Sequence, residues 1–230
     1  MDICRVELYH EQEAGTGGDV DSESSVFKKI YQDYLEQISH LDLSAVAKSI
    51  GVESRGDSVI VPLFGKPYRI HKRGIASPQE GDTSHSVKVV LCKYLLLHPK
   101  RELEDISWVS FKDFRDAAPF VDAFRNNAEM VIARNFAGRV DLLEDSCLRL
   151  GGYNPGMELS YNVILQFDAL PRLPILLLFN DEDDEFSADC RLLFERQAAD
   201  YLDMECLAIL AWLLADYLTQ LSDNMPCEKA

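Results

Sequence analysis

The sequence contains none of the short motifs by which common metal and nucleotide sites are recognised. Its six cysteines include no C-x-x-C pair, and no H-E-x-x-H sequence is present. It also lacks G-x-S-x-G and both glycine patterns that hold phosphates, the Walker A sequence and G-x-G-x-x-G. The strongest sequence indications of a zinc or iron–sulfur site, a serine hydrolase and a nucleotide-binding loop are therefore missing.

Long apolar segments are also absent. No uninterrupted apolar run reaches the ~18–20 residues that cross a bilayer. The start, MDICRVELYHEQEAG, has an early acid and no apolar segment of the kind found in secretory signals. We therefore expect a cytoplasmic protein with no membrane partner. In that compartment a disulfide framework is not expected, and Cys92, Cys147, Cys190 and Cys206, which sit among apolar residues, are predicted to be buried free thiols.

Positive charge is scarce, and negative charge is unevenly distributed. The net charge is −16, yet residues 26–180 carry 19 acids and 19 bases. Residues 1–25 hold seven acids and one base, and residues 181–205 hold ten acids and two bases. Such acidity repels phosphate backbones, so we expect no nucleic-acid partner. The same acidity is compatible with a basic protein partner.

The composition, with 47% hydrophobic residues in 230, is sufficient for a sizeable core. Residues 10–25 are rich in glycine, serine and acids, which is typical of a loosely attached segment. We therefore predict an acidic flexible tail over residues 1–25, a single domain over residues 26–222, and a C-terminal tail over residues 223–230.

Apolar residues at helical spacing predict about seven helices. A buried strand is the alternative for the third of them, because it is apolar on nearly all sides. Ser84 or Ser86 is a candidate cap for that helix, Ser187 for the sixth and Asp203 for the seventh. The predicted helices cover residues 26–38, 43–50, 86–97, 119–136, 140–150, 186–202 and 204–221.

Two β-hairpins are predicted between these helices. Ser58–Phe64 and Pro67–His71 flank Gly65-Lys66, which suits a type II′ turn, and two prolines place this hairpin near a sheet edge. The second hairpin pairs an alternating segment, 159–167, with a continuous apolar run, 174–179. The expected fold class is α+β, with an antiparallel sheet built from two β-hairpins and packed against about seven helices.

Five consecutive acids, Asp181 to Glu185, separate the last predicted strand from the helix after it. A calcium-binding EF-hand loop starting at Asp181 would need Gly at its sixth position and Glu at its twelfth, where Phe186 and Leu192 stand. A looser site for a hard divalent cation is predicted on Asp183, Asp184 and Glu185. The alternative is that these acids only favour the positive end of the following helix.

An aromatic cluster around Trp108 and Phe111 is the candidate lining of a small-molecule or cofactor pocket. The alternative is that these rings belong to the core. His98 follows the predicted helix 86–97. There it either interacts favourably with the helix dipole or serves as a lone axial ligand to a metal-centred tetrapyrrole. The chemical identity of a cofactor is left open.

Several segments resemble an uncharacterised family, a domain of unknown function of anaerobic bacteria and archaea such as sulfate reducers and methanogens. The resemblance covers roughly residues 25–222. It is carried by a Tyr-Leu helix end, W-V-S-F, L-G-G-Y, P-x-x-P and D-E-F, which here are Tyr94-Leu95, Trp108–Phe111, Leu150–Tyr153, Pro171–Pro174 and Asp184–Phe186. Some members look to be fused to a cysteine-rich iron–sulfur segment, and this chain has no clustered cysteines.

The resemblance implies no named chemistry, but it adds Tyr94 to the candidate cofactor-binding residues Trp108, Phe111 and His98. The sequence therefore predicts a non-catalytic accessory module of an anaerobe that binds a small molecule or cofactor. One alternative is an enzyme that uses a carboxylate-bound divalent cation. The other is an interaction module that presents an acidic face to a protein partner.

Overall fold

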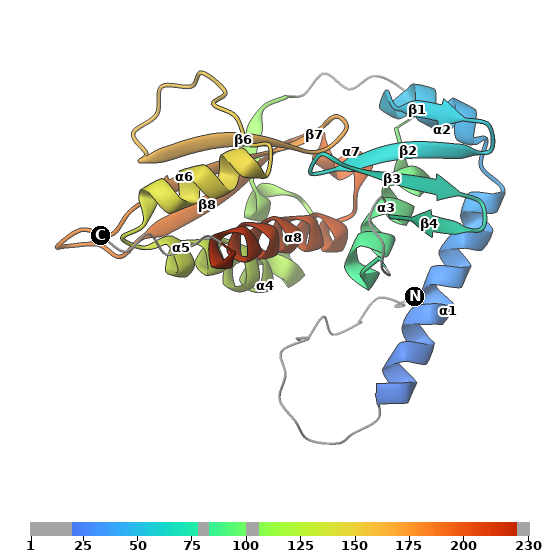
Figure 1. Ribbon diagram of the computed structural model, residues 1–230, viewed down its shortest axis with the longest axis horizontal. Coiled ribbons are helices and arrows are strands. Elements are labelled where there is room, and N and C mark those ends of the chain that lie inside the picture. The colour runs from blue at the N-terminus through green and yellow to red at the C-terminus, as the bar shows by residue number, and fades with distance from the viewer. Residues whose placement is uncertain (1–19, 78–82, 100–105, 225–230) are drawn as a thin grey trace.

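The fold contains two four-stranded antiparallel sheets and a set of helices that cover them (Figure 1). A computed structural model of the protein describes residues 20–77, 83–99 and 106–224, with side chains from Phe27 onward. The predicted fold class, α+β with antiparallel strands, is confirmed. The two predicted hairpins, however, lie in separate sheets.

The first sheet has the strand order β1-β2-β3-β4 and lies beside three helices (Figure 1). The predicted helices at 43–50 and 86–97 are confirmed, and Ser84 caps the second by accepting from the N–H of Val87. The elements are α1 (Val20–Ser39), α2 (Leu43–Ile50), β1 (Glu53–Arg55), β2 (Ser58–Leu63), β3 (Lys66–His71), β4 (Gly74–Ala76) and α3 (His85–Leu97).

The second sheet has the order β5-β8-β7-β6. Trp108 to Phe111 form β5 and the start of a 3-10 turn. The elements are β5 (Trp108–Ser110), α4 (Val121–Phe124), a π-helical turn (Arg125–Glu129), α5 (Met130–Phe136), α6 (Val140–Arg149), β6 (Val163–Leu170), β7 (Leu173–Asn180), β8 (Asp189–Glu195), α7 (Ala198–Tyr201) and α8 (Met204–Asp223).

The turn between β2 and β3 differs from the predicted one. The connecting residues are Phe64 and Gly65, with φ of 46° and 74°, and Leu63 pairs with Lys66. Two successive positive φ values are the requirement of a type I′ turn, not of the predicted type II′ turn. The buried side chain of Phe64 accounts for this, because its packing holds a non-glycine residue in the left-handed region.

The first hairpin occupies the middle of its sheet rather than the edge. Pro62 and Pro67 pair with each other at its turn end, beyond the residues that β1 and β4 reach. Their missing amide donors therefore cost no ladder hydrogen bond. At this end the N–H of Phe64 donates to the Ala169 carbonyl at 2.9 Å, which fastens the first sheet to β6 of the second.

The predicted helix over 186–202 is wrong, because residues 189–195 form strand β8. Cys190, Leu192 and Phe194 are buried in alternation, and only Cys190 and Phe194, four residues apart, also fit helical spacing. Residues 189–194 of this strand pair with β7 and satisfy the backbone hydrogen bonds of its second edge. The acids at 181–185 thus belong to a hairpin loop, and Ser187 caps no helix.

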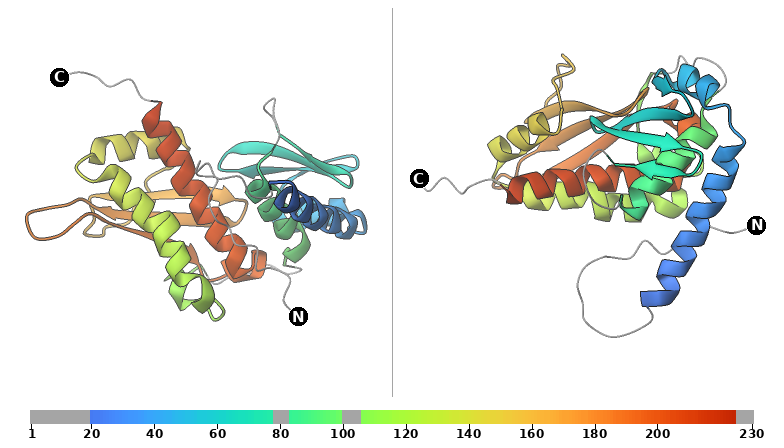
Figure 2. Two further views of the ribbon diagram at one scale, coloured as in Figure 1. Left: turned by 90° about the horizontal axis from the view of Figure 1, so that it is seen from below. Right: turned by 45° about the vertical axis from the view of Figure 1, so that its right-hand side comes forward.

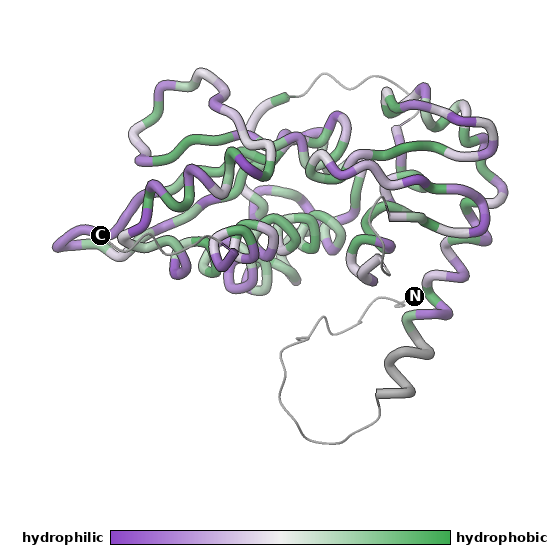
Figure 3. The backbone as a smooth tube through the Cα atoms, viewed as in Figure 1, coloured by the Kyte–Doolittle hydropathy of each residue, from purple (hydrophilic) through white to green (hydrophobic). Residues whose placement is uncertain are grey.

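The second hairpin is confirmed with shifted bounds, since β6 begins at Val163 and residues 159–162 lie outside it. Both strands are mainly apolar in colour in Figure 3. Leu173 to Phe179 are all buried, as the continuous apolar run predicted.

Helix α8 crosses the centre of the molecule. It contacts α3 on one side and α4, α5 and α6 on the other (Figure 2). Asp203 caps it as predicted, accepting from the N–H of Cys206 at 2.9 Å. Among the described helices, this one is long and apolar enough to cross a membrane, yet 61% of its most apolar window is buried inside the protein. That burial is the behaviour of a core helix.

The buried residues from Ile38 to Leu218 form one hydrophobic cluster shared by both sheets. Of the predicted N-terminal tail, residues 20–25 lie in α1, and residues 1–19 lie outside the described part of the chain. Residues 225–230 of the predicted C-terminal tail are likewise outside it.

Candidate functional site

A cavity lies where the two sheets meet. It measures about 760 Å³ and opens between the β2–β3 turn and the β6–β7 turn. Its walls are mainly apolar, with three charged side chains among them. We call it the inter-sheet cleft, lined by Gly51, Val52, Glu53, Ile60, Pro62, Phe64, Gly65, Pro67, Leu150, Gly151, Phe167, Asp168, Leu170, Pro171 and Arg172.

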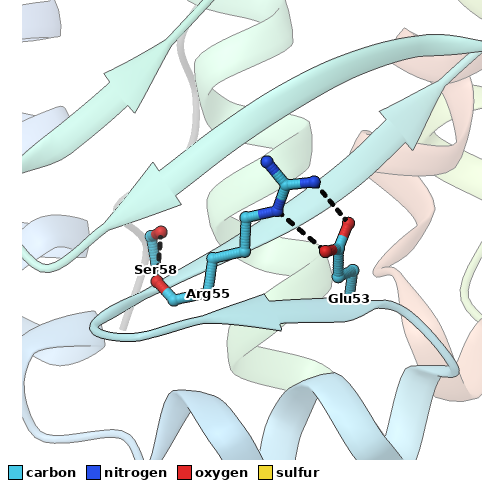
Figure 4. A network of polar contacts seen from close by, with 3 residues as sticks. All are labelled: Glu53, Arg55 and Ser58. Atoms are coloured by element: carbon cyan, nitrogen blue, oxygen red, sulfur yellow. Dashed lines mark hydrogen bonds and ion pairs between the residues drawn. The ribbon is translucent and has the colours of Figure 1, made fainter.

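Glu53 contributes a carboxylate to the wall formed by the first sheet. Both of its oxygens accept hydrogen bonds from the Arg55 guanidinium, at 2.8 Å and 3.2 Å (Figure 4). Ser58 Oγ donates to the Arg55 carbonyl across the β1–β2 turn at 2.9 Å. The hydrogen bonds from Arg55 lower the pKa of Glu53, so this carboxylate is ionised at neutral pH.

Asp168 contributes a carboxylate to the opposite wall. It accepts a hydrogen bond from the Tyr153 hydroxyl at 3.1 Å, and Gln166 Nε2 donates to the same hydroxyl at 2.5 Å. Tyr153 also pairs through its backbone with Gln166, so it extends the exposed edge of β6. Partial burial and the Asp168 carboxylate raise the pKa of Tyr153, which keeps its hydroxyl protonated.

Arg172 stands in the β6–β7 turn at φ 59°, a left-handed conformation that non-glycine residues seldom adopt. Its guanidinium lies beside the end of α2, with Nε 3.6 Å from where a Cβ of Gly51 would be. The Arg172 guanidinium also offsets the rise in pKa that burial gives Tyr201. Arg172 therefore joins the two walls of the inter-sheet cleft.

Two buried tyrosines support this turn from the core. The Tyr94 hydroxyl donates to the Pro171 carbonyl, and the Tyr94 and Tyr201 rings stack with centroids 6.0 Å apart. Burial raises the pKa of Tyr94, so its hydroxyl stays a donor. Tyr94, predicted as a cofactor ligand, lies behind the wall of the cleft rather than in it.

The other predicted cofactor residues lie elsewhere. Trp108 is half-buried on β5, and Phe111 is buried with its ring stacked on Phe124 at 4.3 Å. His98 follows the last turn of α3, where Nδ1 contacts the Leu95 carbonyl at 2.7 Å. None of these residues, nor Tyr94, lines any of the three cavities described in this section and below.

The predicted cation ligands lie on the exposed loop between β7 and β8. The Asp183 carboxylate accepts from the N–H groups of Glu185 and Phe186, both at 2.8 Å, and these bonds lower its pKa. Within the described part of the chain, no group of three or more His, Cys, Asp or Glu side chains is placed to hold a metal ion. Asp183 acts in this structure as the acceptor that closes the loop.

A cation site on Asp183, Asp184 and Glu185 makes a measurable prediction. If these carboxylates held a cation, magnesium, calcium or manganese would raise the melting temperature of the wild type, because an ion that binds only the folded state stabilises it. The same ions should leave a triple variant, Asp183→Asn, Asp184→Asn and Glu185→Gln, unchanged. Differential scanning fluorimetry measures both, and identical responses of the two proteins would exclude this site.

A second cavity, of about 570 Å³, lies between the π-helical turn and the start of β8. The half-buried Glu129 lines it and accepts from the N–H of Leu192 at 3.0 Å. Strand β5 pairs only with residues 193–195 of β8, so the N–H of Leu192 has no partner on β5. Glu129 accepts a hydrogen bond from it instead. Burial raises the pKa of Glu129, an effect that this hydrogen bond opposes. The Glu129 carboxylate therefore serves as a hydrogen-bond acceptor for the backbone of β8.

Cys190 also lines the second cavity, but it is fully buried, and burial raises its pKa well above the ordinary value. A protonated, inaccessible thiol is inert as a nucleophile. Cys92, Cys147 and Cys206 are buried free thiols as well, as the sequence predicted.

Sequence reasoning missed the cleft residues Phe64, Gly65, Asp168 and Arg172 as a site. A signal was present in the segments that carry the family resemblance. Of these, L-G-G-Y supplies Leu150 and Gly151 to the lining and P-x-x-P supplies Pro171 and Arg172. The Tyr-Leu helix end supplies Tyr94, which holds Pro171. Three of the five segments therefore converge on the inter-sheet cleft.

Comparison with known proteins agrees with that resemblance. A family model described as Domain of unknown function (DUF3786) matches residues 42–217, which include all of the cleft lining. No curated protein and no solved structure matches the chain. The match spans more than half of the sequence, so the chain belongs to the DUF3786 family, a family whose domain has no known function.

Proposed function

We propose that this protein is a non-catalytic accessory module that binds a small molecule or cofactor in the inter-sheet cleft. The observation that carries the proposal is the cleft itself, about 760 Å³ of mainly apolar wall with three charged side chains at separate positions. Pockets for small ligands combine these features, and they occur preferentially where structural units meet.

The state of the polar groups favours binding over catalysis. Glu53 is paired with Arg55, and Asp168 accepts from the Tyr153 hydroxyl. Each carboxylate is thus oriented by a partner, and the raised pKa of Tyr153 keeps the hydroxyl beside Asp168 protonated. Such fixed groups select a ligand by shape and charge without a proton transfer.

The setting that we propose with this function is the cytoplasm of an anaerobe, on the resemblance described above. Native mass spectrometry and an absorption spectrum of protein purified without oxygen report a resident ligand directly. An adduct that dissociates on denaturation is the expected result.

A cleft-filling variant tests where the ligand binds. Pro67 is exposed and lines the cleft, so Pro67→Trp is expected to occupy the cavity and weaken binding at least tenfold. The probe is N-phenyl-1-naphthylamine, an uncharged dye whose fluorescence rises in apolar surroundings. Fluorescence titration measures its affinity for each protein.

The matched control is His71→Trp. His71 lies on the same strand and the same face, four residues or about 13 Å farther along, and outside the cleft lining. It should bind the dye as the wild type does. Equal binding by the wild type and Pro67→Trp, with melting temperatures unchanged, would place the dye elsewhere and defeat the proposal.

A further inference from the structure

A third cavity adjoins the inter-sheet cleft. It measures about 470 Å³ and shares four lining residues with the cleft: Phe64, Gly65, Leu150 and Gly151. Its remaining walls come from the start of β3 and the ends of α6 and α8, namely Lys66, Arg149, Tyr217, Gln220, Leu221 and Asn224. The two cavities therefore lie on either side of the same pair of turns.

The charge of this third cavity is opposite to that of the protein. Lys66 and Arg149 are the charged side chains of its lining, which contains no carboxylate. The chain as a whole carries −16, and the neighbouring cleft contains two carboxylates and one guanidinium. Two cations that face one cavity at the surface of a strongly acidic protein favour an anionic group there.

Both cations are available to a ligand. Lys66 Nζ lies 4.6 Å from the centre of the Tyr217 ring, a cation–π contact that positions the ammonium without using its N–H donors. Arg149 is exposed at the end of α6. Among the described residues, neither side chain forms an ion pair with a carboxylate.

Two glycines of the shared turns face open space. Gly65 and Gly151 have φ of 74° and 91°, and nothing lies within 4 Å of the position that a Cβ would take on either residue. A side chain at these positions would project into open space beside both cavities. Glycine keeps the backbone accessible at the junction.

We infer that the ligand of the inter-sheet cleft is an anion with an apolar body, whose carboxylate, sulfonate or phosphate group is held by Lys66 and Arg149. The inference rests on the proposed function, because the apolar body occupies the inter-sheet cleft. Lys66 and Arg149 then determine specificity: they add affinity for the charged group and none for the apolar part.

Two related dyes separate the inference from the proposed function. 1-Anilinonaphthalene-8-sulfonate has the aromatic body of N-phenyl-1-naphthylamine and adds a sulfonate. We expect the wild type to bind the sulfonated dye about tenfold more tightly, which corresponds to about 1.4 kcal/mol. The double variant Lys66→Gln and Arg149→Gln should lose this preference and keep its affinity for the uncharged dye.

Arg69→Gln is the matched control, because it removes a positive charge from an exposed position of β3 outside both cavities. It should preserve the preference, and added salt should weaken only the sulfonated dye. Equal affinities for the two dyes in the wild type, or a preference that survives in the double variant, would overturn the inference. If the wild type binds neither dye, the proposed function itself is refuted.

Discussion

Phe111→Ala is expected to lower the free energy of unfolding by about 3–5 kcal/mol, the usual cost of truncating a buried aromatic ring. Phe111 is 2% exposed, and its ring is stacked on Phe124 at 4.3 Å with an angle of 2° between the planes. Phe114 lies edge-on to it, and both Phe114 and Phe124 contact the Phe194 ring. The truncation removes the centre of this cluster and leaves a cavity.

Urea unfolding at neutral pH measures the effect, with an unchanged dependence on denaturant as the sign that only stability has changed. Phe186→Ala is the control, because Phe186 is 70% exposed and the same truncation there should cost less than about 0.5 kcal/mol. If Phe111 lined a cofactor pocket, Phe111→Ala would lose a ligand with little loss of stability. That outcome would restore the sequence-based interpretation of Trp108 and Phe111.

The fate of this aromatic segment shows what sequence patterns can and cannot predict. An aromatic segment such as Trp108 to Phe111 predicts buried side chains, and Phe111 is buried in the structure. Whether buried rings face a ligand or each other depends on elements distant in the chain, here Phe194 on β8. No local pattern contains that information.

Local signals performed well where one segment determines its own structure. The caps at Ser84 and Asp203 and the hairpin from Ser58 to His71 all follow from neighbours in the chain. The prediction failed at strand β8, because Cys190 and Phe194, four residues apart, fit both a strand and a helix, and the unpaired edge of β7 decided between them. The local helical pattern was therefore overridden by the backbone hydrogen bonds that β7 makes with β8.

The inter-sheet cleft was beyond prediction for a related reason. It exists because the turn at Phe64 and Gly65 meets the end of β6 more than a hundred residues later, through the bond from Phe64 to Ala169. The sequence showed two hairpins but not that they lie in different sheets with their turn ends in contact. Asp168 and Arg172 became candidates only when that contact was known.

The second large effect is expected at Asp203, where Asp203→Ala should destabilise the protein by about 2 kcal/mol. Asp203 caps α8 through the N–H of Cys206, and a lost cap costs about 1 kcal/mol. The same carboxylate lies 3.0 Å from Lys93 Nζ on α3. Both side chains are partly exposed, so losing this ion pair should add no more than about 1 kcal/mol.

Asp203→Asn separates the two contributions. Its amide oxygen still accepts from Cys206, so only the ion-pair part, about half of the loss, is expected. Lys93→Met combined with Asp203→Asn completes a double-mutant cycle, and the coupling energy from urea unfolding measures the pair itself. A coupling of zero would show that the contact contributes nothing.

The pH dependence gives an independent check with a fixed sign. Burial alone would raise the pKa of Asp203, but hydrogen bonds from Cys206 and Lys93 and the charge of Lys93 lower it overall. A carboxylate whose pKa is lower in the folded state contributes its full stability above its unfolded pKa of about 3.9. That contribution disappears as the pH falls from there through the folded pKa.

The difference in stability between the wild type and Asp203→Asn should therefore be constant from pH 7 to about pH 5 and shrink below about pH 4. A difference that stayed constant down to pH 3 would mean that Asp203 titrates alike in both states. Lys93 also lies 5.5 Å over the Tyr34 ring of α1. If the stability difference shrinks at low pH, the Asp203 carboxylate provides the electrostatic interaction that connects α8 with α3.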